Sequence, residues 1–348
     1  MTDRLTAKQG QALLEKEDIL ALGLAADARR KELHPDNVVT FIVDRNINYT
    51  NVCASECHFC AFYRQPGHQE AYLLPTTVIL DKISETIEAG GTQIMLQGGL
   101  NPALGLDYYT GLLQEIKKRY SITIHSFTPT EVLYVARKEG LSLNETLKRL
   151  QAAGLDSLPG GGAEILVDEV RQRVSPKKIS TGEWLQVMEE AHAVGLKTTA
   201  TMVIGMGETY AQRIEHMDRI RNLQEKTGGF RAFIMWSYQP GNTKLGGEKI
   251  SAWEYLRTLA IARLYMDNIR HIQGSWVTQG ERVGQLTLAF GADDLGSIML
   301  EENVVRAAGT AYQMSIDKMT GLIRAAGKQP AQRDTAYHII KHFSEVKL

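Results

Sequence analysis

Short runs of β-branched and apolar residues alternate along this chain with longer segments whose apolar positions recur every three or four residues. The short runs predict strands, and they lie at Val38–Val43, Asn46–Thr50, Thr92–Leu96, Ser121–His125, Leu155–Leu158, Lys197–Ile204, Phe230–Trp236 and Ile272–Val277. The longer segments predict helices over 77–89, 106–120, 131–153, 181–194, 210–226 and 253–267. A last unit is expected around Val283–Ala289, where few residues mark the boundaries.

This alternation is typical of right-handed βαβ units that build a parallel sheet. About eight units favour an α/β fold of the (β/α)8 TIM-barrel type, with its core over roughly 35–295. Helical periodicity over 11–33 predicts a helical lead-in within 1–34, and 296–348 is expected to form a helical extension. Because no repeat or linker is visible, the whole chain is predicted to form one domain. Functional groups of such barrels lie in loops at the carboxyl ends of the strands.

Composition and charge describe an ordinary globular protein. Of the 348 residues, 43% are hydrophobic and 23% are charged, and the formal net charge is −1. Basic residues are scattered among acids, so neither a nucleic acid nor an anionic membrane is an expected partner. The first residues lack the apolar core of a signal peptide, and no stretch approaches the roughly 18 apolar residues of a membrane span. We therefore expect a cytoplasmic protein, in a compartment that keeps thiols reduced.

All three cysteines of the chain lie within eight positions, at Cys53, Cys57 and Cys60. An odd number at such short spacing argues against paired disulfides and favours a metal site. Thiolates suit zinc or an iron-sulfur cluster. A zinc ion would need a fourth ligand, such as His58 or His68. On a four-iron cluster, three thiolates would leave one iron open to a substrate or cofactor. A non-enzymatic zinc or cluster-binding module remains an alternative.

With Phe59 before its last cysteine, this Cys-x3-Cys-x2-Cys motif resembles the signature of the radical S-adenosylmethionine (SAM) enzymes. The resemblance implies a [4Fe-4S] cluster held by the three cysteines, with SAM bound to the open iron and Phe59 near the cofactor. It implies that one electron, from a donor such as flavodoxin or ferredoxin, cleaves SAM to methionine and a 5′-deoxyadenosyl radical. That radical abstracts hydrogen from the substrate.

Three further stretches match positions that contact SAM in this family. Gln97, Gly98 and Gly99 follow a predicted strand and form at least a tight turn. The resemblance implies that this backbone meets the methionyl amino group, although Leu100 stands where many relatives have an acid. Glu164 either caps a helix or binds the SAM ribose hydroxyls, and Ile204 lies in the segment that runs along the adenine in the family.

Two positions near strand ends are candidate catalytic residues. His125 ends a predicted strand, and a histidine there is either a structural hydrogen-bonding group or a catalyst. Asp293 and Asp294 are predicted to lie in a turn after the last strand, where they bind ribose hydroxyl groups, accept a proton, or simply form an Asx-type turn.

Several stretches also resemble one branch of the family, the futalosine-pathway and deazaflavin radical enzymes. They are Pro159–Glu164, Trp236–Pro240, Ser275–Gly280, Gly291–Gly296 and Glu301–Asn303. The similarity is greatest to the cyclising enzymes of menaquinone biosynthesis. It implies that the radical takes hydrogen from the ribose of dehypoxanthine futalosine, that the sugar radical adds to the benzoate ring, and that loss of an electron and a proton restores aromaticity.

Within this resemblance, the substrate's hydroxyl and carboxylate groups need fixed polar partners. The substrate-binding candidates are Arg64, Gln239, Gln279 and Asp293, and the catalytic candidates are Asp294 and His125. An aminofutalosine synthase, in which a radical adds to an enolpyruvyl benzoate, is the alternative within the same branch.

Overall fold

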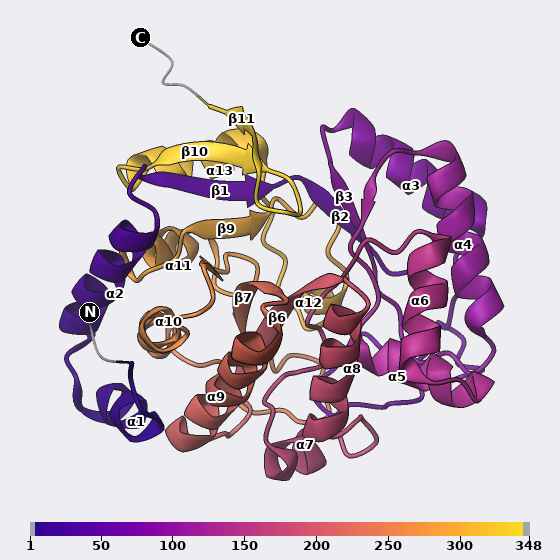
Figure 1. Ribbon diagram of the computed structural model, residues 1–348, viewed down its shortest axis with the longest axis horizontal. Helices are drawn as coiled ribbons and strands as arrows, with labels where there is room; N and C mark the ends of the chain where they lie inside the picture. Colours follow the sequence, from indigo (N-terminus) through magenta and orange to yellow (C-terminus); the bar gives the residue numbers. More distant parts are fainter. Residues whose placement is uncertain (1–3, 344–348) are drawn as a thin grey trace.

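The computed structural model describes residues 4–343 and shows an α/β fold in which helices surround parallel strands (Figure 1). Residues 1–3 and 344–348, the outer ends of the two predicted additions, lie outside the described residues. The strands are β1 (Val38–Ile42), β2 (Asp44–Ile47), β3 (Gln93–Leu96), β4 (Thr123–Ile124), β5 (Ser157–Leu158), β6 (Lys197–Ile204), β7 (Phe230–Ser237), β8 (His271–Gln273), β9 (Asp294–Ser297), β10 (Gln329–Arg333) and β11 (Ile339–His342).

The helices follow the predicted segments closely through the first two thirds of the chain. They are α1 (Ala7–Lys16), α2 (Ile19–Leu33), α3 (Thr76–Glu88), α4 (Leu106–Arg119), α5 (Pro129–Glu139), α6 (Leu143–Ala153), α7 (Asp168–Val174), α8 (Thr181–Ala193), α9 (Tyr210–Thr227), α10 (Ala252–Tyr265), α11 (Glu281–Leu286), α12 (Val304–Ala307) and α13 (Ile316–Ala325). The helix predicted over 131–153 is divided at Gly140, whose φ of 65° ends α5. Ser180 and Thr209 begin α8 and α9 with capping boxes.

The strands form two hydrogen-bonded sheets, ordered β11-β10-β1-β9-β8-β7-β6-β5 and β2-β3-β4. Only Val43 separates β1 from β2, so one continuous segment belongs to both sheets. A parallel bridge between His125 and Ser157 joins β4 to β5. All the named strand pairs are parallel except β10 with β11. The arrangement is consistent with the predicted (β/α)8-type barrel. The division into a single domain stays a prediction.

The last unit expected around Val283–Ala289 has its strand further along the chain than predicted. Helix α11 and a 3-10 turn at Thr287–Ala289 occupy this segment, and the strand is β9, which begins at Asp294. The apolar residues there recur at three-residue spacing, which suits a helix. The turn predicted for Asp293 and Asp294 is also wrong, because Asp294 pairs with Thr40 of β1.

The C-terminal extension is helical only in part. Strand β10 adds to β1 in parallel, with Val38 opposite Gln329. Arg333, at the end of β10, donates to both carboxylate oxygens of Asp294 at 2.5 and 3.0 Å. Beyond it, Thr335 donates to Gln93 of β3 at 2.8 Å. This segment therefore completes the amino-terminal end of the barrel, contrary to the expected helical flank.

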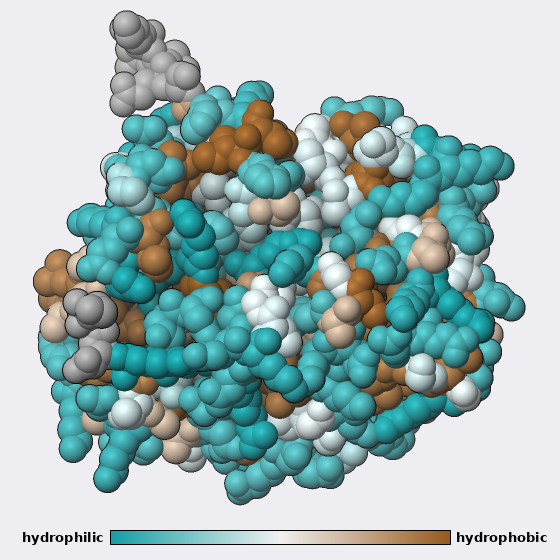
Figure 2. All heavy atoms as spheres, in the orientation of Figure 1, coloured by the Kyte–Doolittle hydropathy of each residue, from teal (hydrophilic) through white to brown (hydrophobic). Residues whose placement is uncertain are grey.

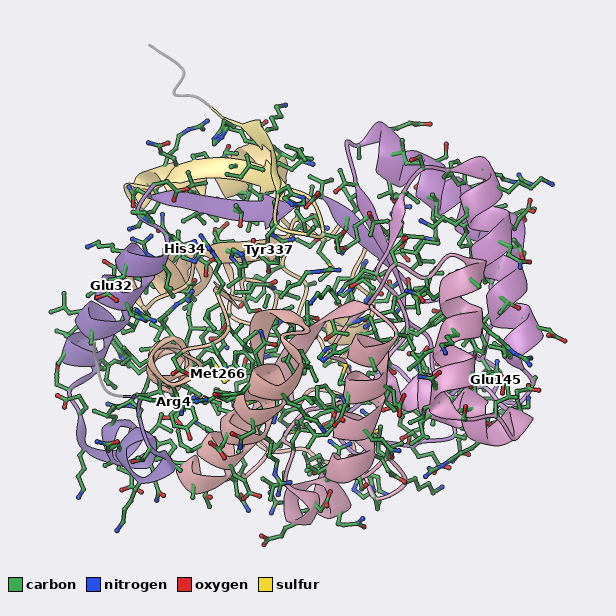
Figure 3. All side chains as sticks on the ribbon, viewed as in Figure 1. Arg4, Glu32, His34, Glu145, Met266 and Tyr337 are labelled. Carbon is green, nitrogen blue, oxygen red and sulfur yellow. The ribbon has the colours of Figure 1, made fainter. Side chains whose placement is uncertain are left out.

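Tyr337 closes the same end. Its ring stacks on His271 with centroids 3.8 Å apart, and the guanidinium carbon of Arg333 lies 3.8 Å from the ring centroid. Figure 3 labels Tyr337 and His34, which lie on the same side of the molecule with His271 between them.

The surface in Figure 2 is mainly hydrophilic, with hydrophobic patches over α2 and near β11. Leu20 and Leu24 on α2 are 62% and 75% exposed, and Ile339 and Ile340 on β11 are also exposed. Within residues 4–343, no helix combines the length and the apolarity that crossing a bilayer requires.

Replacing His216, which is buried on α9, should flatten the pH dependence of stability. Its Nδ1 accepts from the Leu166 N–H at 2.9 Å, and burial, with Arg171 nearby, lowers its pKa from 6.5 to about 3. The unfolded chain therefore binds this proton first as pH falls below about 6.5, and the stability present above that pH is lost towards pH 3. The slope is about 1.4 kcal/mol per pH unit. His216→Gln should remove that slope between pH 6 and 4.5 in urea unfolding.

His342→Gln, at an exposed position, is the matched control and should leave the slope unchanged. Equal slopes for wild type and His216→Gln would contradict the assignment.

Candidate active site

A cavity of about 260 Å³ runs through the inside of the barrel. At the carboxyl ends of the strands it is lined by Asn48, Gln97, Gly98, Gly162, Glu164 and Trp236. Towards the amino ends the lining polar residues include Asp44, Gln93, His125, Arg231, Arg333 and Tyr337. Functional groups were predicted only at the carboxyl ends of the strands. Charged residues also line the cavity near the amino ends, which the prediction did not include.

Three buried polar atoms on this cavity have no hydrogen-bond partner among the described residues. They are Asn46 Oδ1, Glu164 Oε2 and Trp236 Nε1. Buried polar groups in folded proteins are almost always hydrogen-bonded. Two acceptors and one donor without a hydrogen-bond partner therefore belong to residues around one cavity, and Arg171 Nη1 lies 3.8 Å from Glu164 Oε2.

The cysteine loop lies between β2 and α3, and backbone hydrogen bonds hold its shape. Cys53 N–H donates to the Arg64 carbonyl at 3.0 Å, and Arg64 N–H donates to the Asn51 carbonyl at 2.7 Å. Cys57 is 6% exposed, while Cys53 and Cys60 are half-buried. Burial raises the pKa of the Cys60 thiol to about 11 and also raises that of Cys57. Coordination by these thiolates must therefore release protons.

The spacing of the sulfur atoms fits a cluster better than a single ion. Within residues 4–343, the three sulfur atoms do not all lie within 4.8 Å of one another. One tetrahedral zinc ion, with Zn–S bonds of about 2.3 Å, would bring its thiolates within about 4 Å. In a four-iron cluster each thiolate binds a different iron, which suits wider spacing. Leu100 N–H also donates to Cys53 Sγ at 3.4 Å, a kind of contact that tunes such clusters.

Gly98 and Gly99 pack directly against the cysteine loop. A Cβ at Gly99 would lie 2.6 Å from both Cys53 Cβ and the Val52 carbonyl oxygen, and one at Gly98 would lie 2.6 Å from Tyr49 Cζ. Glycine is therefore required at both positions for this approach.

Glu131 of α5 supports this turn from behind. Its Oε1 accepts from Gly98 N–H at 3.2 Å and from the Tyr49 hydroxyl at 2.7 Å. Sequence reasoning missed Glu131, and an acid in the first helical turn after Pro129 was the available signal.

Glu164 joins the cavity to the cysteine loop. It adopts φ +43°, and Lys178 Nζ contacts its Oε1 at 2.7 Å. The same ammonium group lies 5.2 Å from the centroid of Phe59, two residues after Cys57. One charged pair therefore bridges the cluster-binding loop and the cavity wall.

Comparison of the sequence with models of known protein families identifies the family of this chain. The family model described as "Radical SAM superfamily" matches residues 47–220, and "CofH/MqnC C-terminal region" matches residues 227–346. The chain belongs to the radical SAM superfamily. A [4Fe-4S] cluster and SAM are the cofactors that this family implies, and the three thiols, the glycine turn and the free Glu164 oxygen fit them.

Radical SAM relatives resemble the chain over nearly its whole length. It is 49% identical to cyclic dehypoxanthine futalosine synthase of Halalkalibacterium halodurans over 99% of this chain and 93% of that protein. It is 48% identical to the enzyme of the same name from Streptomyces coelicolor, over 97% and 86%. It is 40% identical to 5-amino-6-(D-ribitylamino)uracil–L-tyrosine 4-hydroxyphenyl transferase of Methanococcoides burtonii, over 97% and 96%.

Solved structures agree on the fold. Methylornithine synthase superposes with a TM-score of 0.74 at 19% identity, covering 95% of each chain. The FeFe-hydrogenase maturase HydG from Carboxydothermus hydrogenoformans superposes with a TM-score of 0.77 at 17% identity, covering 96% of this chain and 77% of that chain.

Among the residues predicted for radical SAM chemistry, Gln97, Gly98, Glu164 and His125 line the cavity. Gly99 lies behind Gly98 and contacts the cysteine loop. Ile204 is fully buried outside the lining, and the neighbouring Val203 faces the cavity in its place, because side chains alternate along β6.

The predicted substrate-binding residues lie elsewhere. Arg64 forms an ion pair with Glu70 at 2.7 Å and donates to carbonyls of its own loop. Gln239 bonds to the Ser237 and Thr278 carbonyls, and Gln279 donates to the Ser237 hydroxyl. None of the three lines the cavity, so their hydrogen bonds fix loops of the barrel.

Asp293 and Asp294 are also outside the cavity lining. Arg263 and His271 hold Asp293, and together they keep the pKa of its carboxyl far below the usual range. Asp294 pairs with Arg333. Both acids therefore neutralise buried cations in the barrel wall, which argues against the proton-accepting role expected for Asp294.

Gly99→Ala should impair cluster assembly, because its new Cβ would meet backbone atoms that cannot move freely. We expect iron bound per chain after anaerobic reconstitution to fall several-fold. Gly111→Ala, on α4 with open space around it, should bind iron like the wild type. Full iron content in Gly99→Ala would refute the proposed packing requirement.

Proposed function

We propose that this chain is a radical SAM cyclase that converts dehypoxanthine futalosine to its cyclic form in menaquinone biosynthesis. The observation that carries the proposal is 49% identity to an enzyme of that name over 99% of the chain. The identity spans the cysteine loop, the cavity and the C-terminal segment that completes the cavity. The position of the cavity inside the barrel also suits radical chemistry, since the surrounding walls limit the access of water and other reactants.

When bound, the cluster and SAM supply the 5′-deoxyadenosyl radical that takes hydrogen from the substrate's ribose. The residues of the chain bind the cluster, SAM and the substrate and orient them relative to one another. Cys53, Cys57 and Cys60 would hold the cluster, the Gly98 backbone would meet the methionyl end of SAM, and the Glu164 carboxylate would accept from its ribose hydroxyls. Trp236 Nε1 and Asn46 Oδ1 are left to meet polar groups of the substrate.

We propose His125 as the group that takes the proton leaving the aromatic ring after cyclisation. The Ser157 hydroxyl donates to the Lys197 carbonyl at 2.7 Å, so the 2.7 Å contact between His125 Nδ1 and Ser157 Oγ must be donated by the imidazole. Nε2 then carries the free lone pair. Burial lowers the His125 pKa to about 3, with Arg231 and Arg333 contributing, so the ring starts neutral and would hold the incoming proton only weakly before passing it on.

Two accompanying expectations belong to the same proposal. The electron that starts the reaction comes from a one-electron carrier such as flavodoxin or ferredoxin, and the electron released on aromatisation passes to a carrier of that class. The protein works in the cytoplasm, where thiols stay reduced.

The transferase relatives provide a second candidate, because they are 40% identical over 97% of this chain. Their names describe transfer of a hydroxyphenyl group from tyrosine to a ribitylaminouracil. The same barrel would then serve an intermolecular reaction.

Incubation of the anaerobically reconstituted protein with SAM, a reductant and dehypoxanthine futalosine should give a product two hydrogens lighter than the substrate, with free 5′-deoxyadenosine and methionine. Cys57→Ala should give none, because the cluster lacks a ligand. Mass spectrometry makes the measurement. A product only from tyrosine plus the ribitylaminouracil would select the transferase, and a SAM-derived adduct of an enolpyruvyl benzoate would select aminofutalosine synthase.

Glu164→Gln should weaken SAM binding roughly tenfold, because a charged hydrogen-bond acceptor is lost. Equilibrium dialysis with SAM measures the effect. Glu169→Gln, at an exposed position of α7, is the control. Unchanged SAM affinity in Glu164→Gln would rule out the assigned contact.

A further inference from the structure

Arg231 brings a guanidinium group into the cavity without a counter-ion. It is the second residue of β7 and lines the amino-terminal half of the cavity. Its Nη1 donates to Ser157 Oγ at 3.2 Å and to the Thr335 carbonyl at 3.1 Å. Within residues 4–343, no carboxylate lies within 4.0 Å of it, and Nε and Nη2 donate to no protein atom.

The other charged groups on the cavity each have a charged or hydrogen-bonded partner, although one oxygen of Glu164, Oε2, accepts no hydrogen bond from the described residues. Arg333 makes two hydrogen bonds to Asp294, and Glu164 is paired with Lys178. Asp44 accepts from Gln93 Nε2 at 2.5 Å and from Ser297, and burial raises its pKa to about 6. Burial lowers the pKa of Arg231, and the more distant carboxylates of Asp334 and Asp156 offset this only in part, whereas contact with Asp294 gives Arg333 a raised pKa despite its burial. Burying an unpaired charge is unfavourable, so this arginine lacks an anion.

The side of the Arg231 guanidinium that makes no hydrogen bond within residues 4–343 suits a carboxylate. Nε and Nη2 form the side of the guanidinium that carries two parallel N–H bonds, and this fork fits the two oxygens of a carboxylate. Neither Ser157 nor His125 competes for this edge, because Ser157 Oγ already donates to the Lys197 carbonyl and burial keeps His125 neutral.

We infer that Arg231 binds the carboxylate of an aromatic-acid substrate through this edge and so fixes which way the substrate enters the barrel. The inference rests on the proposed function, in which the substrate is a benzoate joined to a sugar. Arg231 and Trp236 are five residues apart on β7, about 17 Å at the usual rise of a strand. An acid held at Arg231 directs the sugar towards the carboxyl ends, where Gly98 and Glu164 line the cavity.

The experiment measures equilibrium binding of dehypoxanthine futalosine and of its methyl ester to the reconstituted holoenzyme, with SAM present and no reductant. Wild type should prefer the acid by roughly 10- to 100-fold, the range expected for a charged hydrogen-bonded pair. Arg231→Gln should lose this preference by weakening acid binding alone. Arg231→Lys, which keeps the charge without the fork, should retain part of it.

Arg45→Gln is the matched control. Arg45 lies on β2, forms an ion pair with Glu85 at 2.6 Å and does not line the cavity. It should keep the acid preference of the wild type.

Equal loss of acid and ester binding in Arg231→Gln would show that Arg231 only anchors Thr335, and it would overturn the inference. A wild type that converts the acid but binds acid and ester equally would overturn the inference alone. A wild type that neither binds nor converts the acid would overturn the proposed function and the carboxylate site together.

Discussion

The contact between Gly99 and Cys53 is the constraint on which the rest of the site depends. A Cβ at residue 99 would lie 2.6 Å from Cys53 Cβ, so the end of β3 can only touch the cysteine loop through bare backbone. Gly98 N–H donates to Glu131 of α5 on the other side of the turn. The cysteine loop, the end of β3 and α5 are therefore held in fixed positions relative to one another. The three thiols and the mouth of the cavity are thereby placed relative to each other by packing.

Buried charge decides where ligands can bind within this frame. The barrel wall contains arginines whose charges are matched by acids of the same chain, such as Arg263 with Asp293 and Arg333 with Asp294. Such pairs have no further capacity for an anion. In the part of the chain that the structure describes, the walls of the cavity leave a few groups unmatched: the Arg231 guanidinium at one end and single polar atoms along its length.

The sequence predicted the local features well. The cysteine motif needs only short spacing, and the strands and helices up to α10 follow periodicity that neighbouring residues specify. The side chains that face the cavity were harder to predict, because that depends on strand register. A register shift between Thr198 and Thr199 in the pairing of β6 with β7 changes which residues of β7 point inward, and Arg231 was missed.

Errors in the last third have another cause. Asp293 and Asp294 look like turn residues because acids usually face solvent, yet distant arginines hold them inside. The strand β10 carries a proline and polar residues, and it becomes a strand because β1 offers an unpaired edge. Arg64 and Gln239 were expected at the substrate, but their local hydrogen bonds are visible only in three dimensions.

The joining of β10 to β1 has a consequence for how the protein is made. Thr335 and Gln93, which meet at the closed end of the barrel, are 242 residues apart in the chain. During synthesis the cluster-binding loop leaves the ribosome well before the segment around Thr335, so the amino-terminal end of the cavity stays open until that later segment has been made. The three cysteines are therefore available to bind iron and sulfide before the segment that covers the cavity has been made. Radical chemistry, which needs the covered cavity, has to wait for that segment.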